Sequence, residues 1–120
     1  MKSLQVKLFD ALSALSWYAS LAGDGEAAVS AGREAESIVG TISADAWSSP
    51  NRFQKDTTQA RLNLGHSLLI SGDTELAAAI YDEVLRVDSS WRRNLSRDLA
   101  DLDKRHYLRE RLPSINRYFR

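Results

Sequence analysis

Residues 58–91, TQARLNLGHSLLISGDTELAAAIYDEVLRVDSSW, contain a complete pattern for two helices joined by a tight turn. Apolar residues recur at spacings of three and four on both sides of Gly72, as expected for the buried faces of two amphipathic helices. Glycine tolerates the positive φ that ends a helix, and Asp73 or Thr74 can accept hydrogen bonds from the first amides of the next helix. The stretch therefore predicts a helical hairpin that turns at Gly72.

The same turn occurs earlier in the chain, because LAGDGEAA at 21–28 matches ISGDTELA at 70–77. This repeat predicts a first hairpin with helices over 3–22 and 26–39. In the first of these helices, one stripe is predicted to face inward: Leu4, Leu8, Leu12, Leu15, Ala19 and Ala22. A second apolar set lies off that stripe: Phe9, Trp17, Tyr18 and Leu21. A helix with two apolar faces is expected to lie between other helices or in an oligomer contact.

The remaining segments complete an all-α chain of one domain, since 120 residues with few β-branched runs favour helix and suffice for one core. The expected parts are hairpin 1 at about 3–40, a connector at 41–50, hairpin 2 at about 51–88, and a capping helix with a tail at 90–120. Ser49-Pro50 is typical of a helix start. In the capping helix, Leu95, Leu99, Leu102 and His106 are predicted to share one dry face.

The second hairpin resembles the tetratricopeptide repeat in the spacing of its small and large apolar residues: Leu64-Gly65, Leu68, Gly72, Ala77, Tyr81 and Val84. The resemblance implies about two antiparallel hairpins followed by a capping helix. The two Gly-Asp turns are 49 residues apart, whereas a regular array repeats every ~34 residues. We therefore expect extended helices or an inserted loop at 41–57. An unrelated α-helical bundle is the structural alternative.

The resemblance also implies a concave surface, formed by the first helix of each hairpin, that receives a peptide or a helix of a partner. The residues expected on that surface are Ser13, Trp17, Gln59, Leu62, Asn63, His66 and Leu69. Trp17 is either the main anchor for a partner or a plug between the hairpins. Members of this family that bind C-terminal carboxylates use Lys and Asn where this chain has Ser13 and Leu62, so that activity is not expected.

Charge is distributed unevenly although the net charge is zero. Residues 1–90 hold 7 Lys and Arg against 12 Asp and Glu, whereas residues 91–120 hold 9 against 4. The basic residues of the second part that could form a surface are Arg92, Arg93, Arg97, Lys104, Arg105, Arg109 and Arg111. Binding of nucleic acid or of another acidic surface is therefore the alternative function, although no basic–aromatic recognition motif accompanies the charge.

Catalysis and metal binding are not expected. The chain has two histidines and no cysteine, and neither histidine has a nucleophile or a second ligand pair at a suitable spacing. We expect His66 to be a half-buried hydrogen-bonding residue, and Asp98 and Asp101 to lie on a solvated face. Trp47 and Trp91 either cover the ends of the hairpins or make exposed contacts. Trp91 is predicted to belong to the core, and Trp47 is the candidate for exposure. No cofactor is predicted.

The C-terminal cluster of Ile115, Tyr118 and Phe119 is a cap on the last helix, an oligomer contact or a docking tail. The apolar run at 8–22 is shorter than the ~20 residues that cross a bilayer, and we interpret it as core and not as a targeting signal. The lack of cysteine fits a reducing compartment. We expect a cytoplasmic adaptor or chaperone-like module that binds a protein or peptide and self-associates through residues 3–22 or the tail.

Overall fold

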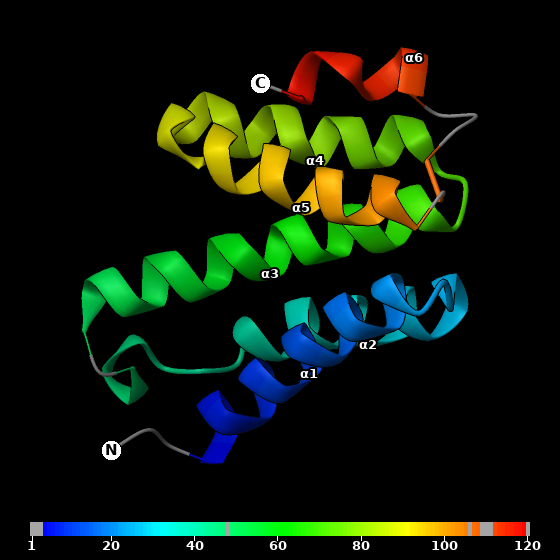
Figure 1. Ribbon diagram of the computed structural model, residues 1–120. Coiled ribbons are helices and arrows are strands. Elements are labelled where there is room, and N and C mark those ends of the chain that lie inside the picture. The colour runs from blue at the N-terminus through cyan, green and yellow to red at the C-terminus, as the bar shows by residue number, and fades with distance from the viewer. Residues whose placement is uncertain (1–3, 48, 106, 109–111, 120) are drawn as a thin grey trace.

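The computed structural model describes residues 4–47, 49–105, 107–108 and 112–119, and within these ranges all regular structure is helical (Figure 1). The longer helices are α1 (Leu4–Leu21), α2 (Gly25–Val39), α3 (Pro50–Ile70), α4 (Thr74–Val87) and α5 (Arg92–Lys104). The short ones are η1 (Ala44–Ala46), η2 (Ser89–Trp91), α6 (Leu112–Ile115) and η3 (Asn116–Tyr118). The prediction of an all-α fold built from helical hairpins is confirmed. No described helix has the length and apolar character needed to cross a membrane.

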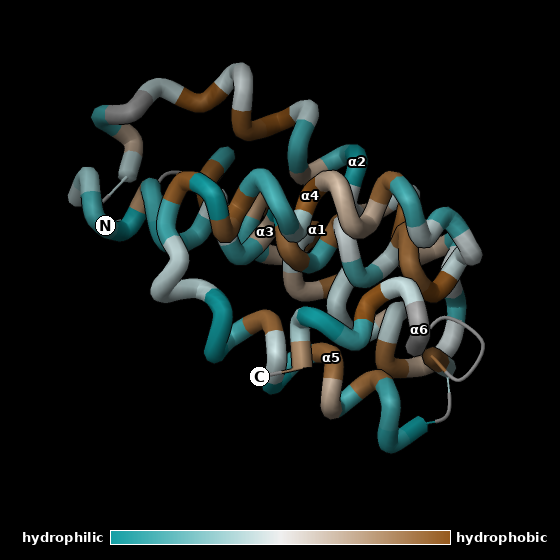
Figure 2. The backbone as a smooth tube through the Cα atoms, turned by 90° about the horizontal axis from the view of Figure 1, so that it is seen from above, coloured by the Kyte–Doolittle hydropathy of each residue, from teal (hydrophilic) through white to brown (hydrophobic). Residues whose placement is uncertain are grey.

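Helix α3 is the central element of the fold. The α1–α2 hairpin packs against one side of α3, and α4 packs against another (Figure 1). Helix α5 packs against the second hairpin and also contacts α1, while the C-terminal segment with α6 lies on the side of α4 away from α1 and α2 (Figure 1). Along each helix, short hydrophobic stretches alternate with hydrophilic ones (Figure 2), which is the pattern of amphipathic helices. The chain thus forms two hairpins, α1–α2 and α3–α4, and the first hairpin packs against α3 of the second.

The helix starts lie where the capping residues predict them. The amide of Ala27 donates to Asp24 Oδ1 (3.1 Å), and the amide of Leu76 donates to Asp73 Oδ1 (3.3 Å). The amide of Arg52 donates to Ser49 Oγ (3.1 Å) directly after the expected proline. Each such cap stabilises a helix by about 1 kcal/mol. The two glycines that are predicted to end a helix also have positive φ, 78° at Gly23 and 99° at Gly72.

Helix α1 is rotated relative to the prediction. Its buried residues are Val6, Phe9, Ser13, Ser16, Ala19 and Ser20. Leu4, Leu8 and Leu15 expose 82%, 51% and 53% of their surface, and Ala22 is exposed, so the prediction that these residues face inward is wrong. It is correct for Ala19, which is buried, and in part for Leu12, which is half-buried.

The close approach of three helices explains the rotation of α1. Ser16 Oγ donates to the carbonyl of Ala28 on α2 (2.8 Å). A Cβ atom at Gly32 would lie 3.0 Å from both the Ser16 hydroxyl and the side chain of Leu64. Leucine side chains facing α2 and α3 would keep the helices apart at this distance. The small side chains therefore form the inner face of α1.

Two hydrophobic clusters stabilise the fold. The larger cluster joins α3, α4, α5 and the C-terminal segment, and its fully buried members include Leu62, Leu69, Tyr81, Leu95, Leu99 and Leu102. The smaller cluster joins the ends of α1, α2 and α3 to the connector through Phe9, Trp47 and Phe53, whose rings meet edge to face. Trp47 exposes only 5% of its surface, so its predicted exposure is wrong.

The C-terminal segment folds back onto α4 and α5. Ile115 and Tyr118 are buried in the larger cluster, and Phe119 packs against it. The Tyr118 hydroxyl donates to Asp82 Oδ1 (2.6 Å), while the Arg117 guanidinium lies 4.6 Å from the centre of the Tyr118 ring. Of the interpretations of this cluster, the cap is the one that agrees with its burial.

Tyr118 is expected to make the protein sensitive to alkaline pH. Burial, and next the Asp82 carboxylate, raise the pKa of Tyr118 to about 12. In the unfolded chain tyrosine ionises near pH 10, so the fold favours the protonated form, and its contribution is lost as pH rises from about 10 to 12. The free energy of unfolding should fall by about 2 kcal/mol through this group. Urea unfolding at several pH values should show that the free energy of unfolding falls less steeply with pH for Tyr118→Phe than for the wild type. An equally steep fall in the two proteins would contradict the assignment of this effect to Tyr118.

Candidate functional site

A cleft opens between α1, α3 and α5, with a volume of about 340 Å³. This volume lies at the lower end of the ~300–1,000 Å³ range of ligand sites. Its lining residues are Asp10, Ser13, Ala14, Trp17, Tyr18, Asp56, Gln59, Asn63, Arg97 and Asp98. Since it contains side chains from both hairpins and from the capping helix, it is the candidate functional site.

Four of the seven residues predicted for the concave surface line this cleft: Ser13, Trp17, Gln59 and Asn63. The other three, Leu62, His66 and Leu69, have no exposed surface. The prediction that these three face a groove is therefore wrong. Helix α3 is covered on several sides, so its C-terminal half presents almost no free face, whereas its N-terminal half remains open toward α1 and α5.

The floor of the cleft is a network of amide and hydroxyl groups. Asn63 Nδ2 donates to Ser13 Oγ (3.1 Å) and to the Ser13 carbonyl (3.2 Å). Gln59 Nε2 donates to Asn63 Oδ1 (3.0 Å) and approaches Asp98 Oδ2 (3.3 Å). The network links α1 to α3 and α3 to α5, so it fixes the relative positions of the cleft walls.

A buried hydrogen-bond chain lies beneath this floor. His66 Nε2 lies 3.1 Å from Asp98 Oδ2, and His66 Nδ1 lies 2.7 Å from the Tyr81 hydroxyl. In the neutral tautomer that satisfies both contacts, Nε2–H donates to the carboxylate and Nδ1 accepts from the tyrosine. Burial, and next the charge of Asp98, raise the pKa of Tyr81 well above its usual value. Tyr81 therefore stays a protonated donor, and the chain ends at Asp98 in the cleft.

Asp98 is the main functional candidate that sequence reasoning missed. It was expected on a solvated face but exposes only 7% of its surface. The sequence does contain a signal for its burial. Asp98 stands three residues after Leu95 and four before Leu102, so it shares the buried face of α5. His66 was predicted to be half-buried and is fully buried; a histidine on a dry face needs a polar partner, and Asp98 supplies it.

Three carboxylates, from Asp10, Asp56 and Asp98, line the cleft together with Arg97 and two aromatic side chains. Asp56 is paired with Arg52, whose Nε lies 3.2 Å from Asp56 Oδ2. Arg97 Nε lies 3.9 Å from Asp98 Oδ1, a loose contact at the surface. Trp17 is half-buried, with its ring 5.4 Å from the His66 ring and part of its surface facing the cleft. Such a site suits a cationic group flanked by apolar surface.

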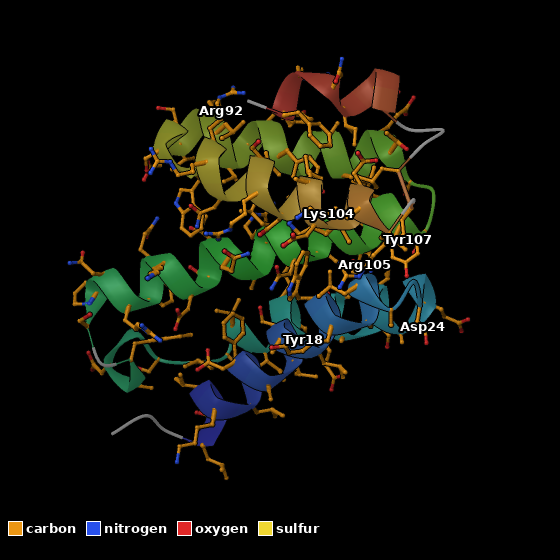
Figure 3. All side chains as sticks on the ribbon, in the orientation of Figure 1. Tyr18, Asp24, Arg92, Lys104, Arg105 and Tyr107 are labelled. Atoms are coloured by element: carbon orange, nitrogen blue, oxygen red, sulfur yellow. The ribbon has the colours of Figure 1, made fainter. Side chains whose placement is uncertain are left out.

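The predicted basic surface is spread along α5, with Arg92 and Lys104 at opposite ends of the helix (Figure 3). Several of its cations already have neighbours: Arg92 donates to the carbonyl of Arg117 (3.1 Å), and Lys104 lies 3.9 Å from Asp101. Arg105 donates to the carbonyl of Asp101 (3.3 Å). Arg109, Arg111 and also His106 lie outside the described residues.

Trp91 does not line the cleft between α1, α3 and α5. It is half-buried and lines a smaller hollow of about 210 Å³ beside α3 and α4. The prediction that it belongs to the core is correct only in part, because it packs against the larger cluster with one side. Trp91 therefore offers a comparison for Trp17, a tryptophan of similar burial at a different place.

The titratable side chains do not form a metal site. In the part of the chain that the structure describes, no three His, Asp or Glu side chains gather as the ligands of one ion would. Comparisons with protein-family models, with curated proteins and with solved structures found no match to this chain.

Proposed function

We propose that this chain is a non-catalytic interaction module that binds a segment of a partner protein in the cleft between α1, α3 and α5, with a lysine or arginine of that segment inserted. The observation that carries the proposal is the lining of the cleft: three carboxylates, of which that of Asp56 is paired with Arg52, beside Arg97 and two aromatic rings. A negative, partly enclosed site attracts cations and disfavours phosphates and carboxylates.

Asp98 is the proposed receptor for the inserted cation. Its Oδ2 atom is fixed by His66 and Gln59. Within the described part of the chain, its Oδ1 atom contacts Arg97 Nε at 3.9 Å and accepts no shorter hydrogen bond, so it retains capacity to accept hydrogen bonds from a ligand. A carboxylate held in place before binding loses little freedom when the ligand arrives, which favours affinity.

Trp17 and Tyr18 are the proposed apolar walls. Trp17 is braced by His66, and Tyr18 is 65% exposed at the rim. A cation within about 6 Å of an aromatic ring is attracted to its face, and large, partly exposed aromatic residues dominate the binding energy of many interfaces. The basic side chain of a peptide can therefore reach Asp98 beside the Trp17 ring, without the peptide covering the exposed leucines of α1.

We extend the proposal to the absence of catalysis because the cleft lacks an activated nucleophile. Ser13 Oγ is hydrogen-bonded to Asn63 Nδ2, an amide nitrogen that cannot accept a proton. The one histidine of the network, His66, is fully buried below the floor. The groups that remain at the surface of the cleft are suited to binding.

Arg97 distinguishes the proposed function from the alternative, nucleic-acid binding by the basic surface. Arg97→Glu removes the one cation of the cleft, so a Lys- or Arg-centred peptide should bind about three to ten times more tightly. If the basic surface binds nucleic acid, the same substitution should weaken binding of single-stranded DNA. Peptide binding and nucleic-acid binding both weaken with salt, so salt dependence does not separate them. The direction in which Arg97→Glu changes each affinity does.

The measurement is fluorescence polarisation with two probes. The first is the best peptide from an array that varies the central residue, and the second is a single-stranded oligonucleotide. Trp17→Ala should weaken the peptide about 30-fold, as expected for an interface anchor, while Trp91→Ala should leave its affinity unchanged. Circular dichroism confirms that each variant is folded. The proposal would be refuted if the protein bound peptides with an acidic central residue more tightly than those with Lys or Arg. It would also be refuted if a folded Trp17→Ala variant bound the peptide as tightly as the wild type.

A further inference from the structure

A stripe of exposed apolar side chains runs along α1. It consists of Leu4, Leu8, Ala11, Leu15 and Tyr18, which we call the α1 seam. Leu4, Leu8, Leu15 and Tyr18 expose 82%, 51%, 53% and 65% of their surface, and Ala11 is exposed as well. A helix whose small polar side chains face the core and whose leucines face outward is inverted relative to an ordinary surface helix. Covering this face with a second apolar surface would remove its leucines from water and is therefore favourable.

We propose that a second copy of this chain covers the α1 seam, with the two α1 helices antiparallel and related by a twofold axis near Ala11. This proposal does not rest on the cleft or on its ligand. It rests on the spacing of the seam, on the order of its side chains and on the area that they expose.

The spacing of the seam is that of two helices packed along their length. Its residues are separated by four, three, four and three positions, which is a heptad pattern with an apolar residue at each inward position. Such a stripe keeps facing a partner helix over several turns, whereas a face for a globular partner has no reason to keep this period. The occupant is therefore expected to be a helix.

The order of side chains in the seam is symmetric, which identifies that helix as another α1. Leu4 and Tyr18 each lie seven residues from Ala11, and Leu8 and Leu15 lie three and four residues from it. In an antiparallel pair, Ala11 of each copy sits at the crossing point, where the small side chain permits close approach. Leu8 of one copy then meets Leu15 of the other, and Leu4 meets Tyr18. A surface that is complementary to itself is the requirement for a twofold contact.

Charge permits the same arrangement. No charged side chain belongs to the seam, and Lys7 is its exposed neighbour on α1. In the antiparallel pair, the two Lys7 residues are eight helical positions apart, or about 12 Å along the axis. This separation exceeds the screening length of about 8 Å at physiological salt. Antiparallel helices also place opposite dipole ends side by side.

The exposed area is sufficient for a weak dimer. With roughly 200 Å² for each large side chain, the exposed parts of the seam amount to roughly 500 Å² per copy, and pairing buries roughly 1,000 Å² in total. That total is near the lower limit for a specific interface. We therefore expect a dissociation constant in the micromolar range.

Disulfide trapping tests the twofold position. The chain has no cysteine, so Ala11→Cys introduces a single thiol at the predicted crossing point, where the two Cβ atoms can approach within bonding range. Under mild oxidation this variant should form a covalent dimer. Ser37→Cys, on an exposed position of α2, is the matched control and should stay monomeric. Equal cross-linking of the two variants would show that the seam is not the contact.

Sedimentation equilibrium tests the assembly without a cross-link. The wild type should approach twice its mass of 13.4 kDa at high micromolar concentration. Leu8→Glu combined with Leu15→Glu should be monomeric with unchanged helix content, because both leucines are about half exposed and outside the core. A wild type that stays monomeric would overturn the proposal and assign the seam to a different partner. A dimer that survives the double substitution would overturn it too.

Discussion

Replacing Tyr81 with alanine is expected to lower the free energy of unfolding by about 3–5 kcal/mol. Tyr81 has no exposed surface and lies at the centre of the larger cluster, with its ring 5.2 Å from that of Tyr118 and 5.5 Å from that of His66. It also fills the space above Gly65, where an added Cβ would come within 2.7 Å of the ring. Alanine would leave a cavity between α3 and α4 and remove the hydrogen-bond partner of a buried imidazole.

Tyr81→Phe is the control that separates the ring from the hydroxyl. It keeps the packing and removes the contact with His66 Nδ1, so the expected loss is about 1 kcal/mol. Urea unfolding, followed by circular dichroism, measures both variants. Similar losses for alanine and phenylalanine would mean that the hydroxyl, and not the ring, makes the larger contribution, contrary to the packing described above.

Asp98→Ala is expected to lower the free energy of unfolding by about 2–4 kcal/mol and to abolish binding of a cationic peptide. The substitution leaves His66 Nε2–H without its acceptor in a place that water does not reach, and removes one acceptor of Gln59. A buried donor that loses its partner destabilises the fold by about 1–3 kcal/mol, and more when the lost partner was charged. The same carboxylate is the proposed receptor in the cleft, so stability and binding should fall together.

Two variants control for this effect. Asp98→Asn keeps an acceptor oxygen but removes the charge, so it should lose less stability than Asp98→Ala while still losing affinity for the peptide. Asp101→Ala changes a half-exposed carboxylate on the same helix and should alter stability by less than about 0.5 kcal/mol. If Asp98→Ala proves as mild as Asp101→Ala, the buried chain from Tyr81 to Asp98 does not contribute to stability as the geometry indicates.

The parts of the fold that depend on neighbours in sequence could be predicted. Caps at Asp24, Ser49 and Asp73 and stops at Gly23 and Gly72 act within one turn of the chain, and each lies where the sequence predicts. The helix bounds follow from these residues. The family resemblance stays a prediction, because the hairpins agree with it but also with other all-α proteins.

The rotation of α1 could not be predicted from its own residues. Its leucine stripe has the stronger hydrophobic signal, and hydrophobicity alone places it inward. The deciding residues lie on other helices: Gly32 on α2 brings α1 so close that only side chains such as Ser16 fit between them. Where a helix has serines on one face and leucines on the other, the sequence does not show which face packs inward until the distance to the neighbouring helix is known.

The candidate site was predictable from α1 and α3 but not from α5. Ser13, Trp17, Gln59 and Asn63 follow from the helical repeat, since the resemblance places them on one surface. The resemblance implies a capping helix but assigns none of its residues to the concave surface, so the contribution of α5 could not be placed. Asp98 resembles its charged neighbours in composition, and only its position relative to Leu95 and Leu102 distinguishes it.

The two hydrophobic clusters have a consequence for how the molecule can open. Between them lies a polar layer in which Ser13, Asn63 and Gln59 bond to one another, and α3 is the longest element common to both clusters. Polar layers exchange their hydrogen bonds for water more readily than apolar contacts separate, so local unfolding tends to follow such boundaries. We therefore expect the contact between α1 and α3 to open at this layer before either cluster separates. A ligand that bridges α1 and α5 would hold this contact closed.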